Sequence, residues 1–549
     1  MRLKTLSLII PVALFFASCQ SNKADLLIMN ATIYTVDSSF SIQQAMAIKD
    51  GKILATGTNE DISKNYSAKE TIDASGKFIY PGFIDAHAHF MGYASSLQTV
   101  NLVGTKSFSE CLQRIQDFIS NKRLAEGAWI IGRGWDQNDW SKKDFPTNDS
   151  LNALYRGNPV ILTRIDGHAA IVNDVALNIA GIKGPMEMVG GKVEIENGKP
   201  TGVLIDNAVE LVSSKIPALN NEAMAAAFSE AEKNCFAKGL TTIDDCGLDN
   251  EIIMMIDSLQ QAGKLKMRIY AMLADNPRNY SFLEKRGKIK TDRLNMRAMK
   301  VYADGALGSR GACLLEPYAD KKDHYGFLLS NKEHFDSVAA MLVKYDFQMC
   351  THAIGDSGNR VVLNTYAKHL LPGNDKRWRI EHAQVVNPRD LLQFHDLNII
   401  PSVQPTHATS DMYWAGERLG KEREKTAYAY RQLLVQSGWM PLGTDFPVED
   451  IDPLKTFYAA VFRKDATGWP EQGYQMENAL PATDALRGMT IWAAKSNFEE
   501  QEKGSLEKGK FADFIILDKD LLKAGEKEIL QTKVLSTYLN GEKVFSLNK

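Results

Sequence analysis

The chain has 549 residues, of which 44% are hydrophobic and 24% are charged, and its formal net charge is −3. This composition is ordinary for globular proteins and excludes disordered, collagen-like and membrane-embedded chains. So small a net charge supplies no basic field, and we expect no nucleic-acid partner. The six cysteines include no Cys-x-x-Cys pair, which argues against a disulfide scaffold and against a zinc finger.

The first residues predict an export signal over residues 1–18. Arg2 and Lys4 precede an apolar run from Leu6 to Phe16, and small residues follow it. Cys19, after these small residues, resembles the lipobox cysteine of bacterial lipoproteins, which is acylated. We therefore expect an exported protein of the bacterial cell envelope that is held at a membrane by this lipid only. The alternative is an ordinary cleaved signal with an incidental cysteine.

Short β-type runs occupy both ends of the chain. The N-terminal runs are separated by turn signals, among which Asp50-Gly51 predicts a tight hairpin. Residues 512–517 and 534–539 repeat this pattern near the C-terminus. Neither end is large enough to fold alone, so we expect residues 19–80 and 505–549 to form one composite β-sandwich.

The middle of the chain, residues 81–504, alternates β-type runs with helical patterns. Residues 222–238 and 251–262, for example, have apolar residues three and four positions apart. Eight parallel strands alternating with helices predict an α/β fold, a (β/α)8 TIM-type barrel. The eight runs are residues 83–89, 240–245, 267–273, 296–302, 347–352, 378–383, 398–403 and 440–445.

The connection after the first barrel run is unusually long. Residues 90–222 contain strand signals of their own, and we interpret most of this stretch as an inserted cap region over the barrel mouth. The alternative is a packing elaboration away from the mouth.

Side chains that can bind a metal stand where the barrel runs end. His87 and His89 are two residues apart in an extended run, so both imidazoles point to one side and can reach one ion. Taken alone, this pair has the alternative reading of a hydrogen-bonded histidine pair. Barrel enzymes, however, gather reactive groups from several strands at this face. The further candidates at strand ends are Lys300, His352, His382 and Asp445. Imidazole and carboxylate ligands suit zinc or a similar divalent metal, as one or two ions.

The segment from Phe83 to His89, preceded by Pro81-Gly82, resembles the signature of the amidohydrolase superfamily of metal-dependent hydrolases. The resemblance covers nearly the whole mature chain and is strongest to the branch containing N-substituted formamide deformylases. The other segments that carry it are Gly134-Trp135-Asp136-Gln137, Asp304-Gly305, Thr351-His352-Ala353-Ile354-Gly355-Asp356, Ile380-Glu381-His382, Gly443-Thr444-Asp445-Phe446-Pro447 and residues 504–513.

The resemblance implies a set of ligands for this chain. It implies His87 and His89 on one metal, His352 and His382 on a second, and Asp445 beside the first. Lys300 matches the bridging lysine of the family, which is carboxylated by CO2. For Lys300 the alternative is a buried lysine paired with Asp304.

These ligand types predict hydrolysis by metal-activated water, with Asp445 as general base and then general acid. We expect an amide-type carbon–nitrogen bond of a small molecule to be cleaved. Two alternatives remain open: the same site hydrolysing a cyclic amide, carbamate or ester, and a non-catalytic regulatory or binding lipoprotein on this fold. The oligomeric state also stays open.

Several residues are candidates for substrate contact or catalysis. His168, in the insert, matches a recurring histidine of the branch and would polarise the carbonyl or bind substrate; the alternative is a structural loop histidine. Trp135 and Gln137 would line an aromatic pocket, or Trp135 serves packing. Arg310 would hold an anionic group, or forms a loop salt bridge. His407 follows the seventh run and is expected to face the barrel mouth.

Overall fold

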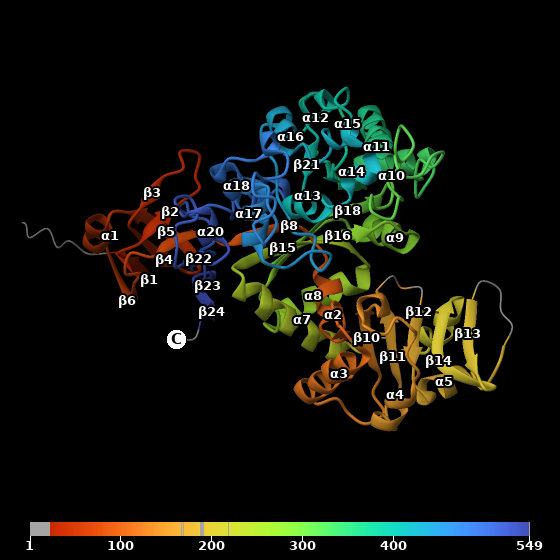
Figure 1. Cartoon of the computed structure of the whole chain (residues 1–549). Helices are drawn as coiled ribbons and strands as arrows, with labels where there is room; N and C mark the ends of the chain where they lie inside the picture. Colours follow the sequence, from red (N-terminus) through yellow and green to blue (C-terminus); the bar gives the residue numbers. More distant parts are fainter. Residues whose placement is uncertain (1–21, 166, 168, 187–190, 218, 548–549) are drawn as a thin grey trace, which may run out of the picture.

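The computed structural model describes residues 22–547 apart from 166, 168, 187–190 and 218, and it contains three units (Figure 1). A β-sandwich lies on one side of a central α/β barrel, and a lobe formed by the long insert lies on another side (Figure 1). The expected fold is confirmed. The predicted export signal, Cys19 and His168 lie outside the described residues.

Parallel strands form the barrel wall. Their side chains are buried almost without interruption because neighbouring elements cover both faces of a parallel sheet. The short β17 (Ile289–Lys290) pairs antiparallel with β18 at the edge of this sheet. In order around the wall, the parallel strands of the described chain are β8 (Phe83–Ala88), β15 (Leu240–Leu248), β16 (Arg268–Ala274), β18 (Leu294–Tyr302), β19 (Gln348–Ala353), β20 (Arg379–His382) and β21 (Ile400–Ser402).

The eighth predicted run, residues 440–445, closes the barrel without forming a regular strand. Leu442 makes a single parallel bridge to Val403, and its carbonyl accepts a hydrogen bond from Ala86 N at 3.2 Å. A Cβ on Gly443 would lie 2.5 Å from the backbone nitrogen of His87. At Gly443 the segment therefore approaches β8 more closely than a residue with a side chain allows.

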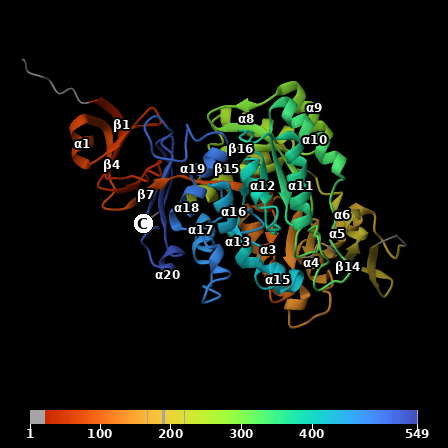
Figure 2. The ribbon, with the colours of Figure 1, turned by 90° about the horizontal axis from the view of Figure 1, so that it is seen from above.

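Helices surround the barrel, as the view from above shows (Figure 2). The predicted helices at 222–238 and 251–262 correspond to α7 (Asn221–Ala237) and α8 (Asn250–Gln261). Asparagine side chains accept hydrogen bonds from first-turn N–H groups of α7 and two later helices, which fixes where these helices begin. The other helices of this unit are α9 (Pro277–Arg286), α10 (Lys332–Tyr345), α11 (Asp356–His369), α12 (Leu392–Asp396), α13 (Pro405–Asp411), α14 (Ala415–Leu419), α15 (Lys421–Glu424), α16 (Tyr430–Ser437), α17 (Pro453–Phe462), α18 (Ala482–Gly488) and α19 (Ile491–Ser496).

The sandwich unites the two chain ends. Antiparallel pairing of β7 with β22 joins residues more than 400 positions apart, and Phe514 stacks on Tyr538 in the core between the sheets. One sheet contains β1 (Asn22–Met29), β4 (Ala45–Lys49), β5 (Lys52–Gly57) and β6 (Tyr66–Asp73). The other contains β2 (Thr32–Tyr34), β3 (Ile42–Gln43), β7 (Phe78–Pro81), β22 (Phe514–Leu517), β23 (Val534–Leu539) and β24 (Glu542–Ser546), and the short helices α1 (Asn59–Asn65) and α20 (Glu526–Ile529) flank them.

The insert has a mixed sheet and hydrophobic clusters of its own. Since α2 (Phe90–Ser96) begins directly after His89, the lobe is attached at the end of the barrel that carries the candidate ligands. Lys122 in the lobe pairs with Glu230 on α7. Its role as a cap over the mouth stays a prediction. Its other elements are β9 (Val100–Asn101), α3 (Phe108–Lys122), β10 (Ile130–Trp135), α4 (Asp149–Leu154), β11 (Val160–Arg164), β12 (Ala169–Val172), α5 (Asp174–Ala180), β13 (Gly191–Glu196), β14 (Lys199–Asp206) and α6 (Asn207–Ser213).

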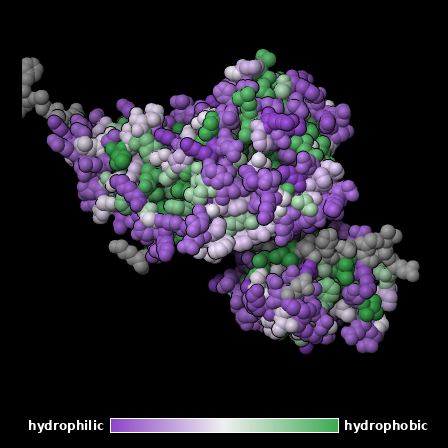
Figure 3. All heavy atoms as spheres, turned by 45° about the horizontal axis from the view of Figure 1, so that its top comes forward, coloured by the Kyte–Doolittle hydropathy of each residue, from purple (hydrophilic) through white to green (hydrophobic). Residues whose placement is uncertain are grey.

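Polar and charged side chains cover most of the face of the molecule seen in Figure 3, with apolar groups scattered among them. Within the described part of the chain, no helix combines the length and the apolar character needed to cross a membrane.

Candidate metal centre

The predicted ligands converge at the carboxyl-terminal end of the barrel. His87, Lys300, His352 and His382 lie at the ends of four different strands, while His89 directly follows β8. The His87 ring centroid is 5.8 Å from that of His89 and 4.7 Å from that of His382, and the His352 and His382 centroids are 4.5 Å apart. Four imidazoles from distant parts of the sequence therefore share one site.

Asp445 completes the cluster. Its Oδ1 lies 3.3 Å from His89 Nε2 and 3.6 Å from His87 Nε2. One possible ligand atom each from His87, His382 and Asp445 lies within 4.8 Å of the others, and all three residues are buried. Such a set of ring nitrogens and carboxylate oxygen is the donor chemistry of zinc and similar divalent metals.

Unusual backbone conformations direct two of these side chains into the site. His382 has a φ of 72° and Asp445 a φ of 65°, both in the left-handed region that ordinary residues avoid. In a regular strand Glu381 and His382 would point to opposite faces, whereas the turn at His382 lets both reach the barrel interior. Strain of this kind typically marks functional sites.

Unsatisfied buried atoms show that the cluster fits a cation. His352 Nε2, His382 Nδ1 and Asp445 Oδ1 are buried and have no hydrogen-bond partner among the described residues. Buried polar atoms rarely remain unpaired, because each loses its hydration without compensation. One or two bound divalent cations would give these atoms the partners that they lack.

The histidines are in the form that a metal needs. Burial, together with the charge of Lys300, lowers the pKa of His87 to about 4 and that of His352 to about 3. Burial and the neighbouring His352 hold the pKa of His382 well below its usual range. Neutral imidazoles keep a nitrogen lone pair available for coordination.

Lys300 points into the same cluster. Its Nζ lies 3.1 Å from His87 Nε2 and is fully enclosed. Asp304 instead accepts backbone N–H groups, at 2.8 Å from Cys313 and at 2.9 Å from Ile354. Lys300 therefore lies beside the predicted ligands and not in a pair with Asp304, while its bridging position and its carboxylation stay predictions.

A buried carboxylate orients the first histidine. Glu381 Oε2 accepts a hydrogen bond from His87 Nδ1 at 2.6 Å, and both side chains are 0% exposed. Burial alone would raise the pKa of Glu381, but His87 and the guanidinium of Arg379 lower it to about 2. The carboxylate thus fixes the proton on Nδ1 and leaves the Nε2 lone pair directed at the site. Sequence reasoning assigned Glu381 no role, since no local pattern links it to a histidine 294 positions away.

His407 contacts the general-base candidate directly. Its Nε2 lies 3.1 Å from Asp445 Oδ2, and its Nδ1 lies 3.2 Å from Glu449 Oε1. Burial would lower the pKa of His407, but the two carboxylates raise it to about 10. His407 faces the mouth as expected, with both ring nitrogens engaged by protein groups.

Comparison with known proteins identifies the family. The sequence model of the amidohydrolase family matches residues 70–545. The chain belongs to this family. It is 32% identical over 541 residues to Protein LONG AFTER FAR-RED 3 of Arabidopsis thaliana, an alignment that covers 95% of this chain and 92% of the relative. It is 27% identical over 542 residues to N-substituted formamide deformylase of Arthrobacter pascens, covering 94% and 97% of the two chains.

A solved structure supports the same conclusion. An uncharacterized metal-dependent hydrolase from Pyrococcus horikoshii has a TM-score of 0.76 and 29% sequence identity to this chain, over 91% of this chain and 99% of the other. The expected resemblance is confirmed, and the protein is a metal-dependent hydrolase of the amidohydrolase family. Membership in this family implies a divalent metal, which the cluster fits.

The predicted substrate residues of the insert lie in the interior of that lobe. Trp135 is 1% exposed and donates its indole N–H to the carbonyl of Leu162 at 2.7 Å. Gln137 Oε1 accepts a hydrogen bond from Arg164 Nε at 2.8 Å. These contacts favour the packing alternative for Trp135, and a substrate contact by either residue stays a prediction.

Arg310 takes part in a surface ion pair. Its Nη2 lies 2.6 Å from Asp320 Oδ2, and its Nε donates to Asp320 Oδ1 at 3.1 Å. Arg310 thus forms the loop salt bridge of the alternative, and its binding of an anionic substrate group stays a prediction.

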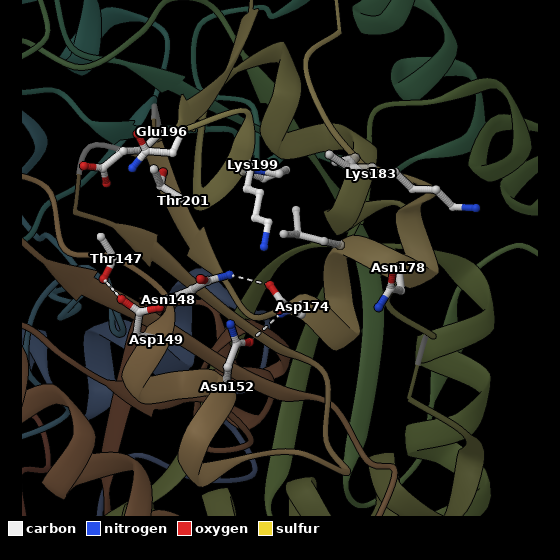
Figure 4. Close-up of a pocket in the computed structure, with 14 residues that line it drawn as sticks. Thr147, Asn148, Asp149, Asn152, Asp174, Asn178, Lys183, Glu196, Lys199 and Thr201 are labelled. Atoms are coloured by element: carbon white, nitrogen blue, oxygen red, sulfur yellow. Dashed lines mark hydrogen bonds between the residues drawn. The ribbon is translucent and has the colours of Figure 1, made fainter.

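A separate groove of about 580 Å³ lies in the insert lobe (Figure 4). Asn148 Nδ2 donates to Asp174 Oδ1 at 3.0 Å, and Asn152 accepts from the Asp174 backbone at 2.7 Å. The amine of Lys199 points into the groove between these side chains (Figure 4). Its lining shares no residue with the candidate metal centre.

Proposed function

We propose that this protein hydrolyses an amide-type carbon–nitrogen bond of a small molecule at the barrel mouth. One observation carries the proposal: buried, unpaired atoms of His352, His382 and Asp445 converge with His87 and His89 at the ends of the barrel strands. This arrangement supports metal-assisted hydrolysis better than a purely structural role, because a structural cluster would pair its polar atoms internally.

His87, His89, Lys300, His352, His382 and Asp445 would hold one or two divalent ions, with Lys300 in carboxylated form. A divalent cation such as zinc, held there, would lower the pKa of bound water towards about 7 and polarise the substrate carbonyl. The fully buried Glu381 keeps His87 in the coordinating tautomer.

Asp445 would transfer the proton. Its Oδ1 faces the histidines and accepts no hydrogen bond within the described chain. A carboxylate oxygen has two lone pairs, so Oδ1 would contact the metal with one and take a proton from the attacking water with the other. The same oxygen would then deliver that proton to the departing nitrogen, which makes the amine a better leaving group. General acid–base catalysis of this kind typically contributes about 10²- to 10⁴-fold.

The name of one relative supports the bond type. N-substituted formamide deformylase of Arthrobacter pascens aligns with 94% of this chain, and its name describes action on a formamide. We therefore infer an acyclic amide as the first substrate class to test.

Two measurements on purified protein test the proposal. Metal analysis is expected to find one or two divalent ions per chain, and a panel of small amides, cyclic amides, carbamates and esters is expected to show preferred turnover of an amide. Asp445→Asn is expected to lower turnover at least about 100-fold. Turnover of esters alone would refute the bond type, and a metal-loaded enzyme that cleaves nothing in the panel would refute the hydrolase proposal for these substrates.

We also propose that the protein is exported and lipid-anchored through Cys19. The support is the order of basic residues, apolar run and small residues before this cysteine. Cys19→Ser is expected to move the protein from the membrane fraction to the soluble fraction of the cell envelope. Unchanged fractionation of this variant would contradict the anchor.

A further inference from the structure

The two oxygens of Asp445 have different surroundings. Oδ2 lies 3.1 Å from His407 Nε2, whereas Oδ1 is unpaired and faces His89 and His87 at 3.3 Å and 3.6 Å. A carboxylate has a broad terminal torsion with little preference of its own. Something outside Asp445 must therefore decide which oxygen faces the metal ligands.

His407 is itself held from its far side. Its Nδ1 lies 3.2 Å from Glu449 Oε1, which also accepts the Ser410 hydroxyl at 2.6 Å. Ionised carboxylates only accept hydrogen bonds, so both nitrogens of His407 act as donors and the ring plane is fixed at two points. The side chains of Asp445, His407 and Glu449 are only 8%, 12% and 20% exposed, which limits competition from water.

The chain of contacts links two separate elements. His407 lies on α13, while Asp445 and Glu449 flank the loop that follows the barrel-closing segment. Asp445 N donates to the His87 carbonyl at 2.7 Å, so this loop is also tied to β8. The orientation of Asp445 therefore depends on α13 as well as on its own loop.

We propose that Glu449 is a positioning residue which, through His407, holds the Asp445 carboxylate so that Oδ1 stays directed at His87 and His89. The inference rests on the proposed metal centre and extends it to a residue outside the ligand set. It also gives His407 a different role from the substrate contact expected from the sequence, because neither ring nitrogen is left for a substrate.

The test measures how fast the metal-loaded protein releases its metal to a chelator, which requires no substrate. Glu449→Ala is expected to release metal about 10-fold faster, the lower end of the effect of removing such supporting groups. Glu449→Gln keeps an acceptor oxygen for His407 and is expected to retain metal nearly as well as the natural protein. Asp450→Asn, in the same loop but paired with Lys455 at 2.6 Å, serves as the matched control with unchanged release.

A double-mutant cycle separates positioning from general loosening of the fold. If Glu449 acts through His407, Glu449→Ala adds no further loss in a His407→Ala background. Additive effects, or a Glu449→Ala variant that releases metal at the natural rate, would overturn the proposal. Glu449→Leu, which fills the glutamate volume, replaces the alanine variant in the cycle if the latter does not fold. A natural protein that retains metal but cleaves no amide would refute the proposed function while the cycle still decides this inference.

Discussion

The buried contact between Glu381 and His87 offers the most direct test of the metal centre. Glu381→Gln keeps the side-chain volume but replaces an ionised acceptor, 2.6 Å from His87 Nδ1, with a neutral one. Hydrogen bonds to charged acceptors are about twice as strong as neutral ones, and loss of such a supporting group typically lowers metal affinity about 10- to 100-fold. At about 1.4 kcal/mol for each factor of ten, this corresponds to about 1.4 to 2.8 kcal/mol of binding free energy.

The assay is competition for metal against a chelator of known affinity. Glu232→Gln is the matched control, because Glu232 is also buried and accepts the backbone N–H groups of Lys266 and Met267 at 2.7 and 2.8 Å, but lies on α7. We expect the control to lose stability without losing metal affinity. A folded Glu381→Gln protein that binds metal as tightly as the natural protein would refute the orienting role of Glu381.

Three further predictions follow from the fold and the site. Gly443→Ala places a methyl group 2.5 Å from the His87 backbone and is expected to lower the free energy of unfolding by about 1–3 kcal/mol and to reduce metal content. Gly184→Ala is the control, because a Cβ there has nothing within 4 Å and is expected to leave the melting temperature unchanged. Equal melting temperatures of the two variants would contradict the close approach. Trp135→Ala removes a buried side chain from the insert and is expected to destabilise that lobe by about 3–5 kcal/mol. Limited proteolysis is expected to cut the lobe faster while the metal content stays unchanged, and loss of metal would instead place Trp135 near the site. Asp445→Asn is expected to lower kcat at least 100-fold in a protein whose circular dichroism is unchanged, and a smaller loss would argue against its role as general base.

The sequence was most informative where functional residues are spaced with the repeat of a strand. The spacing of His87 and His89 predicts two rings on one side of a strand, and their centroids lie 5.8 Å apart. The seven strands with regular pairing fall within a few residues of the predicted runs, because turn residues on either side of each apolar run mark where the strand begins and ends. The same reasoning cannot show that the eighth run pairs irregularly or that Gly443 lies so close to β8, since both depend on contacts that only the closed barrel makes.

Supporting contacts were beyond the reach of the sequence. Glu381 and Glu449 act on residues that only the closed barrel brings near them, and nothing in the spacing of either glutamate distinguishes it from the many others in the chain. Trp135 shows a different limit: its place in a family-like segment is compatible with a pocket and with packing, and only the structure shows that its ring is buried in the insert and that its N–H is paired.

The observed site departs from strand alternation at Glu381 and His382, which are adjacent on β20. Alternation would place Glu381 and His382 on opposite faces of β20, so at most one of them would serve the metal centre. The left-handed conformation of His382 lets one side chain orient His87 and the next face the same cluster. A strand end that leaves regular geometry thus supplies two adjacent functional groups where a regular strand supplies one, and the strain of about 1–3 kcal/mol is offset by packing elsewhere in the barrel.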